Sequence, residues 1–171
     1  MSSSAGVKPV LKIELKRADG AQLVKEDAVL KASELVTALG STADAVLRSG
    51  TALRFAAKSK LFEQGHAGHS VFFVIRGDVR LAARNEGSDD SFDLGLVHAG
   101  EFVGEAEVLA GGGMRAFSAL ADNPVEALEL ARASLTSAQG QLPRDLMMLF
   151  ERARKRRQAS LDEMNDFLNR W

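Results

Sequence analysis

Between residues 51 and 130 the chain reads as short apolar segments separated by turn residues, and this pattern limits the fold more than any other feature. The segments predicted to form strands are Leu53–Ala56, Leu61–Phe62, Val71–Ile75, Val79–Ala82, Phe92–Val97, Ala116–Ala121 and Val125–Leu130. Turn signals such as Gly77-Asp78 and Asn123-Pro124 separate most of them. Short strands at this spacing predict a closed or double-sheet β structure of the jelly-roll type.

Before the strands, residues 31–49 change to a helical period. The apolar residues at this spacing are Leu35, Val36, Leu39, Ala43, Val46 and Leu47. Ser33 and Thr42 are candidate N-caps, while Gly40 and Gly50 are stop signals. Two short helices are therefore predicted here.

A long helix is predicted from Pro143 to the end of the sequence, because proline suits the first helical turn. Its apolar residues, which form a broken stripe, are Leu146, Leu149, Phe150, Ala153, Leu161, Met164, Phe167 and Leu168. Its basic patch is formed by Arg152, Arg154, Lys155, Arg156 and Arg157. The patch is interpreted as a solvated helix face. The alternative interpretations give the helix a role, either as a dimer seam along the stripe or as a lid that moves.

The beginning of the chain has a different pattern. Residues 10–16 alternate apolar and charged side chains, and Ala18-Asp19-Gly20 follows as a turn signal before residues 22–24. This predicts an added β-hairpin after a disordered tail of six residues. The predicted organisation is a tail and hairpin over 1–30, a barrel with entry helices over 31–142, and a C-terminal lid or dimerisation helix over 143–171.

Composition narrows the class of protein. A chain of 171 residues is long enough for one core of ordinary size. The formal net charge of -1 gives no overall field that would attract nucleic acid or anionic membrane, and the absence of cysteine excludes disulfides and thiolate metal sites. With no secretory signal pattern and no run of about 20 apolar residues, a cytoplasmic protein without membrane contact is expected.

The segment from Phe102 to Ser118 carries the chemistry of an anion cradle. Gly104 lets the backbone approach a ligand closely, and the first N–H groups of a helix that begins near Glu105 have no partners within the helix. Arg115 can present a planar fork of donors to a phosphate, and Glu105 can accept from sugar hydroxyls. A phosphorylated ribose is the ligand that this combination indicates.

These residues resemble the phosphate-binding cassette of cyclic-nucleotide-binding domains, the type found in the catabolite activator protein and in protein kinase A regulatory subunits. The Gly104-Glu105 pair and Arg115 match its spacing, residues 98–102 resemble its lead-in, and residues 61–81 are similar to the early strands of the family. The resemblance covers roughly residues 45–160. It implies a mainly β fold with flanking α-helices: an eight-stranded jelly-roll-like β-roll, N-terminal helices and a long C-terminal helix.

The resemblance also implies a function. Arg115 and the backbone N–H groups near Glu105, Ala106, Glu107 and Ala116 would bind a cyclic phosphate, and Glu105 would take the ribose 2′-hydroxyl. Ala116 favours cAMP slightly, with cGMP or a cyclic dinucleotide as alternatives, and no further cofactor is expected. The implied protein is a non-enzymatic receptor that relays occupancy through its C-terminal helix to an effector protein or a second copy.

Two departures from the family pattern give a second hypothesis. Glu107 stands where a small residue is usual, so its carboxylate would lie close to a bound anion, and Phe117 is bulky where a small residue is typical. The alternative is a degenerate module that keeps the barrel, binds no ligand and acts through protein contacts.

Other chemistries have weaker support. His66, His69 and His98 lie in or beside the predicted barrel, but H-x-x-H in a glycine-rich turn differs from the H-x-H of metal-dependent cupins. No cysteine and no G-x-S-x-G elbow offers a nucleophile. No DNA-binding module is recognisable after the barrel, so a nucleic-acid partner is not predicted. The histidine spacing and the missing nucleophile motifs likewise predict neither a metal site nor a catalytic residue.

Overall fold

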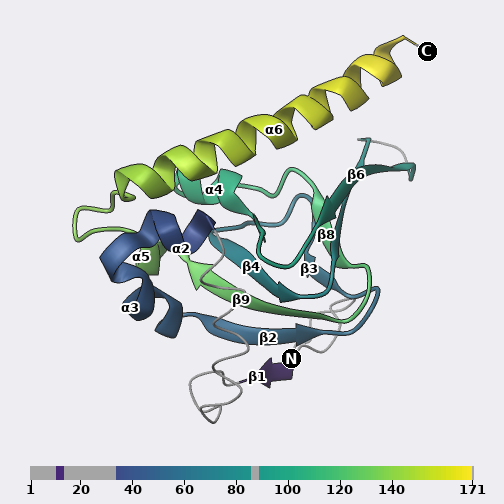
Figure 1. Cartoon of the computed structure of the whole chain (residues 1–171). Helices are drawn as coiled ribbons and strands as arrows, with labels where there is room; N and C mark the ends of the chain where they lie inside the picture. The colour runs from purple at the N-terminus through teal and green to yellow at the C-terminus, as the bar shows by residue number, and fades with distance from the viewer. Residues whose placement is uncertain (1–10, 14–33, 86–88, 171) are drawn as a thin grey trace.

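The computed structural model describes residues 11–13, 34–85 and 89–170, and these form a two-sheet antiparallel β-roll flanked by helices (Figure 1). One sheet has the order β1-β2-β9-β4-β7 and the other has the order β3-β8-β5-β6. The strands are β1 (Leu11–Ile13), β2 (Thr51–Phe55), β3 (Lys60–Phe62), β4 (Ser70–Arg76), β5 (Val79–Arg84), β6 (Ser91–Val97), β7 (Phe102–Val103), β8 (Ser118–Ala121) and β9 (Val125–Ala131). The helices are α2 (Glu34–Leu39), the 3-10 turn η2 (Gly40–Thr42), α3 (Ala43–Arg48), α4 (Glu105–Ala110), α5 (Arg132–Leu135) and α6 (Arg144–Asn169).

Strand β4 is the centre of the fold. It pairs with β9 on one side and β7 on the other, and its residues are buried from Ser70 to Ile75. Alternate side chains point to opposite faces of a sheet. Val71, Phe73 and Ile75 therefore join the core beneath the helices, whereas Phe72 and Val74 join the core inside the roll. One strand thus belongs to both cores.

Helix α6 crosses the helix-covered side of the roll and continues past it (Figure 1). Its first half buries Leu146, Leu149, Phe150 and Ala153 in the core beneath the helices. The large apolar residues of its second half are partly buried, except for the exposed Phe167, and Leu161 and Met164 pack against the core inside the roll. The helix therefore touches both cores and leaves its outer face to solvent.

The predicted fold class is confirmed, with β2–β9 as the eight strands of the roll. Two short elements escape the prediction, the two-residue strand β7 and the helix α5. The strand predicted over 116–121 begins only at Ser118, because Ala116 and Phe117 complete a bend after Arg115. The single long helix after Pro143 is confirmed, with Pro143 as its N-cap.

The N-terminal predictions are tested only in part. Strand β1 pairs antiparallel with β2. The second arm of the predicted hairpin, residues 22–24, lies outside the described residues, and so does the candidate N-cap Ser33. Thr42 occupies the N-cap position of α3, but its hydroxyl donates to the carbonyl oxygen of Leu39 at 2.7 Å and caps no N–H group. The capping role predicted for Thr42 is therefore wrong.

Candidate functional site

The cassette predicted from sequence folds as a strand, a short helix and a glycine loop. Gly104 precedes α4 with a φ of 101°, a left-handed conformation that a residue with a side chain rarely adopts. After α4, Gly111, Gly112 and Gly113 also have positive φ and return the chain toward β8. This path places Arg115 beneath the start of α4, as the spacing predicted.

The Arg115 side chain is 3% exposed and its guanidinium is bound by the protein itself. Nη1 donates to Oε1 of Glu107 at 2.7 Å and to the carbonyl oxygen of Gly104 at 3.1 Å. Nη2 donates to the carbonyl oxygen of Ser70 at 2.9 Å, and the guanidinium carbon lies 4.2 Å from the centre of the Phe62 ring. Both terminal nitrogens of the fork are therefore engaged.

The loop before β4 closes over this arginine. The Arg115 backbone exchanges hydrogen bonds with His66 O and Gly65 N, both at 2.8 Å. A Cβ atom at Gly68 would lie 2.1 Å from Arg115 Nε, so only glycine fits there. Nε is buried and has no hydrogen-bond partner among the described residues.

Glu107 is the acidic partner that fills the cassette. It is 8% exposed, and burial raises the pKa of its carboxyl above the ordinary value while the hydrogen bond from Arg115 opposes that rise. Burying two charges is costly, and the contact between them offsets that cost together with the hydrogen bonds from Arg115 to the carbonyl oxygens of Gly104 and Ser70. The carboxylate thus takes donors that the sequence assigned to a phosphate.

Glu105 lies at the start of α4, as predicted, but its carboxylate faces α6. It is 1% exposed and forms an ion pair with Arg157. Arg157 Nη2 also donates to the carbonyl oxygen of Phe102 at 2.8 Å. We call this set, formed by Glu105, Arg157 and the Phe102 carbonyl, the helix clamp, because it fixes α6 to both sides of Gly104.

The remaining predicted site residues lie at different depths. Phe117 is 6% exposed and packs in the core inside the roll, with its ring centre 6.0 Å from that of Phe62. Ala106 is half-buried and Ala116 is exposed. Leu161 and Met164 of α6 are partly buried and pack against the same core as Phe117.

In this arrangement the residues do not fit a bound cyclic phosphate. Glu107 holds one fork nitrogen of Arg115, a carbonyl holds the other, and the Glu105 carboxylate is paired with α6. One hollow lies between α2 and α6 and another lies between β6 and α6, and none of the predicted cassette residues lines either. A phosphate would have to displace the Glu107 carboxylate first.

Three contributors to the site were not predicted from sequence. Ser70 contributes its backbone carbonyl, which leaves no mark in a sequence, and Phe62 contributes its ring face. Arg157 belongs to the basic patch, and its spacing was the signal that could have found it. It lies four positions after Ala153 and four before Leu161, and so falls on the apolar stripe.

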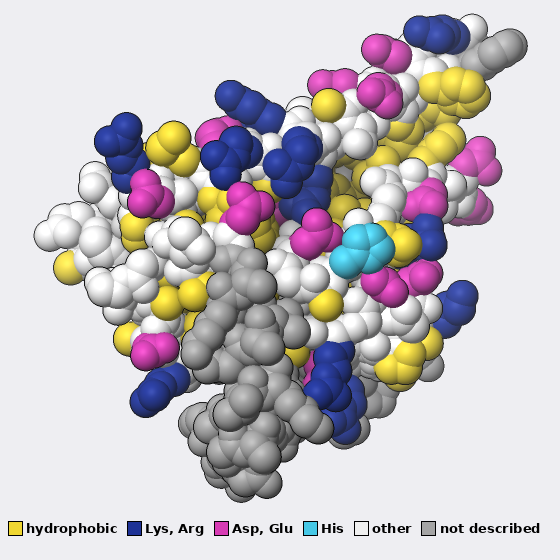
Figure 2. All heavy atoms as spheres, viewed as in Figure 1, with side chains coloured by type: hydrophobic (Ala, Val, Ile, Leu, Met, Phe, Trp, Pro, Cys, Tyr) yellow, Lys and Arg dark blue, Asp and Glu magenta, His cyan; other side chains and the backbone are white. Residues whose placement is uncertain are grey.

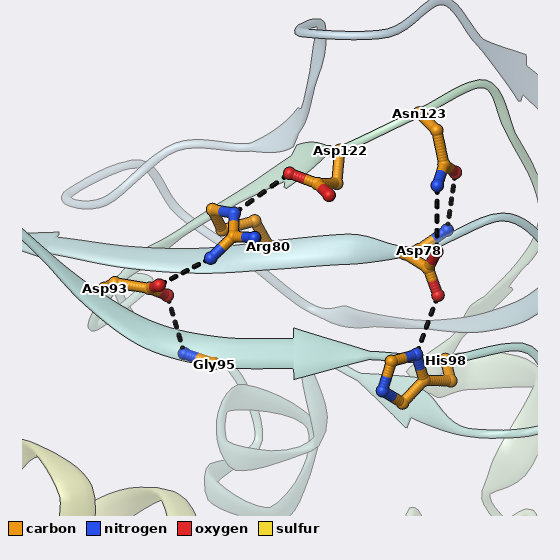
Figure 3. Close-up of polar contacts among 7 residues, drawn as sticks. All are labelled: Asp78, Arg80, Asp93, Gly95, His98, Asp122 and Asn123. Carbon is orange, nitrogen blue, oxygen red and sulfur yellow. Dashed lines mark hydrogen bonds and ion pairs between the residues drawn. The ribbon is translucent and has the colours of Figure 1, made fainter.

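The histidines lie apart from the cassette contacts. His66 and His69 are exposed in the loop before β4, and among the described residues no group of three metal-ligating side chains forms. His98 lies at the end of β6, where its Nδ1 is 2.7 Å from Asp78 Oδ1 (Figure 3). Asn123 also donates to Asp78, at 2.8 Å, and neighbouring Arg80 bridges Asp93 and Asp122.

The His98–Asp78 pair predicts a pH-dependent contribution to stability. The Asp78 carboxylate raises the pKa of His98, and the hydrogen bond from His98 lowers the pKa of Asp78. The contribution of His98 is complete below its ordinary value of 6.5 and is lost as pH rises through the raised pKa. That of Asp78 is present above 3.8 and is lost as pH falls through the lowered pKa.

The thermal midpoints of the wild type and His98→Asn should therefore differ most at about pH 5.5 and converge by about pH 8.5. Thermal denaturation followed by circular dichroism at both pH values measures the difference. An equal difference at the two values would show that His98 acts through packing and not through its charge.

Among the described helices, none has the combination of length and apolar character that a bilayer crossing requires.

The sequence matches the family model described as "Cyclic nucleotide-binding domain" over residues 52–139. No curated protein gives a significant match.

Solved structures share the fold at low sequence identity. The regulatory subunit of a cAMP-independent protein kinase A from Trypanosoma brucei is 14% identical, with a TM-score of 0.66 over 85% of this chain and 53% of that chain. The cAMP-bound regulatory domain of Toxoplasma gondii protein kinase A is 20% identical, with a TM-score of 0.61 over 70% of this chain and 45% of that chain. The Thermus thermophilus catabolite activator protein is 24% identical, with a TM-score of 0.53 over 81% of this chain and 59% of that chain. The alignment thus spans only about half the length of the kinase subunits.

Proposed function

Because this chain belongs to the cyclic nucleotide-binding domain family, whose domains are regulatory and not catalytic, we propose that it is a regulatory interaction module whose cassette is closed by its own Glu107. The observation that carries the proposal is the buried ion pair between Glu107 and Arg115 at 2.7 Å. In this role the carboxylate acts as a tethered substitute for the phosphate. The module then acts through protein contacts and needs no cyclic nucleotide.

Energetics favour the closed cassette. Binding a cyclic phosphate at Arg115 would require the Glu107 carboxylate to leave its arginine, and a second anion beside it would be repelled. Hydrogen bonds to charged groups contribute about 1.5–3 kcal/mol each, so losing the internal bond offsets much of what a phosphate would gain. Nucleotide affinity is therefore expected to be low in the wild type.

The position of α6 supports the same proposal. The helix clamp holds α6 against the cassette, and Leu161 and Met164 pack against the core inside the roll. A ligand that has no preference between a docked and a released helix cannot shift that equilibrium. With α6 already docked, a partner protein becomes the agent that recognises or releases it.

Two structural neighbours give a precedent for a change in nucleotide binding within this fold. One is described as the regulatory subunit of a cAMP-independent kinase, and a triple mutant of that subunit is described as bound to cAMP in its A site. Within this fold, a few substitutions can therefore accompany nucleotide binding. This precedent supports Glu107 as the residue whose removal would open the cassette here.

A second candidate function is a cytoplasmic cyclic-nucleotide receptor, with cAMP as its ligand and an effector protein as its partner. The observation that favours it is Arg115 Nε, which is buried without a hydrogen-bond partner among the described residues. An unsatisfied buried donor is costly, and a phosphate oxygen would satisfy it. In this reading Glu107 swings away when the nucleotide enters.

Isothermal titration with cAMP, cGMP and cyclic di-GMP separates the two functions. The wild type is expected to give no binding heat at about 1 mM nucleotide, and Glu107→Ala should bind at least one of the three with at least about tenfold higher affinity. Asp44→Ala, which removes an exposed carboxylate on α3, is the matched control and should behave as the wild type does. Adding Arg115→Lys to Glu107→Ala should abolish the gain, because lysine lacks the planar fork.

Micromolar binding of a nucleotide by the wild type would overturn the closed-cassette proposal and establish the receptor. Binding by neither protein would support a ligand-free module with no latent site.

A further inference from the structure

The outer face of α6 has its charges separated into two halves. Its exposed charged residues between positions 152 and 166 are basic in the first half (Arg152, Lys155 and Arg156) and acidic in the second half (Asp162, Glu163 and Asp166). Figure 2 shows Lys and Arg side chains gathered along the first part of α6 and Asp and Glu side chains along the second. Such a separation is unfavourable for parallel self-contact and favourable for antiparallel contact.

The spacing of these charges is symmetric about Ala159. Arg152 and Asp166 lie seven positions before and after it, and Lys155 and Glu163 lie four positions before and after it. Arg156 and Asp162 lie three positions before and after it. Positions that differ by three, four or seven share one face of a helix, and the six charged residues are exposed. The face is therefore complementary to itself when reversed end to end.

A hollow and an exposed aromatic ring beside this face come together in the same arrangement. A hollow of about 330 Å³ lies between α2 and the first half of α6, and its lining includes Ala38, Met148 and Leu149. In the second half of α6, Phe167 is 53% exposed and lies eight positions after Ala159, while Leu149 lies ten positions before it. At 100° per residue both fall on the same side of the charged face, so reversal brings Phe167 of one copy beside this hollow of the other.

We propose that the outer face of α6 binds a second copy of this chain in an antiparallel, two-fold arrangement centred on Ala159. In this dimer Arg152 faces Asp166 of the other copy. At 100° per residue Lys155 lies on one side of the face with Asp162, and Arg156 lies on the other side with Glu163. Lys155 therefore faces Asp162 of the other copy and Arg156 faces Glu163, with each pair formed twice. Phe167 enters the hollow at Met148 and Leu149. A closed two-fold contact uses the same surface on both copies, as this spacing requires.

The expected dimer is weak and sensitive to salt. Each exposed ion pair contributes little by itself and is screened at high ionic strength, and the apolar contribution comes mainly from Phe167. The proposal rests on the proposed function because it names the partner of the interaction module. The two proposals can be tested separately. A monomeric protein would not contradict the closed cassette, and nucleotide binding would not contradict the dimer.

Sedimentation velocity of the whole chain tests the proposal through charge reversal. Lys155→Glu and Asp162→Lys should each weaken the wild-type dimer at least about tenfold, as should about 0.5 M salt. The double variant Lys155→Glu with Asp162→Lys should restore it, because the exchanged charges still face each other in the antiparallel arrangement. Phe167→Ser should weaken the dimer without changing its charge.

Cross-linking fixes the direction of the contact. The chain has no native cysteine, so a single introduced cysteine gives an unambiguous product. Ala159→Cys should form a disulfide-linked dimer under mild oxidation, and Asn165→Cys, exposed on another side of α6, should not. A protein that stays monomeric at about 1 mM in low salt would overturn the proposal, as would a dimer that the double variant fails to restore or that cross-links at Asn165 and not at Ala159.

Discussion

Replacing Arg115 with methionine is expected to lower the free energy of unfolding by about 3–5 kcal/mol at pH 7, because Glu107 stays buried without its partner. For a chain of this size the thermal midpoint should fall by roughly 6–20 °C. The loss should be smaller near pH 5. The pKa of Glu107 is already raised and rises further without the guanidinium, so the folded state takes up a proton and loses the buried charge. Urea denaturation at both pH values measures the effect.

The double variant Arg115→Met with Glu107→Leu is the control for this prediction. It removes both charges and should lose less stability than Arg115→Met alone, since no unpaired ion remains in the interior. If the double variant instead lost the sum of the two single effects, the residues would be independent and the closed cassette would lose its support.

Replacing Arg157 with methionine is expected to cost about 2–4 kcal/mol and to loosen the second half of α6. Glu105 would remain 1% exposed with its cation removed, and the Phe102 carbonyl would lose its donor. Hydrogen exchange measured by mass spectrometry should become faster in residues 154–169 while the first half of α6, which is buried in the core beneath the helices, stays protected.

Arg156→Met is the matched control, because Arg156 is the exposed neighbour of Arg157 on the same helix. Measured at about 0.5 M salt, where the outer face of α6 is screened, it should leave stability and exchange unchanged. Equal effects of the two substitutions would mean that the helix clamp contributes nothing specific.

Most of the fold could be predicted because its strands are short apolar segments and its turns carry glycine or Asn-Pro signals. Strand β7 could not, since two residues are too few to show a period, and its pairing with β4 depends on contacts far along the chain. The start of β8 was predicted two residues too early because Ala116 and Phe117 are apolar. Phe117 is buried as such a residue should be, but from a bend and not from a strand.

The site was predictable to a different extent. The resemblance indicated Gly104, Glu105, Glu107 and Arg115, and the sequence already identified the Glu107 carboxylate as unusual. The sequence could not show whether Arg115 pairs with the Glu107 carboxylate or stays open to a phosphate, because that depends on distances of a few ångströms. Nor could it give the carbonyl of Ser70, since every residue has one. Arg157 could have been selected among the five basic residues, because it lies on the apolar stripe between Ala153 and Leu161. The assignment of a nucleotide to these residues stays a prediction.

Strand β4 makes the two cores inseparable. Its odd-numbered side chains fill the space beneath the helices, and its even-numbered side chains Phe72 and Val74 fill the roll. The carbonyl oxygen of Ser70, its first residue, accepts a hydrogen bond from Arg115 Nη2. Because neighbouring residues of one strand share the same ladder of hydrogen bonds, neither core can melt while the other stays intact. The described chain is therefore one cooperative unit, and any opening of the cassette short of global unfolding has to come from side chains and from α6, with the sheet left in place.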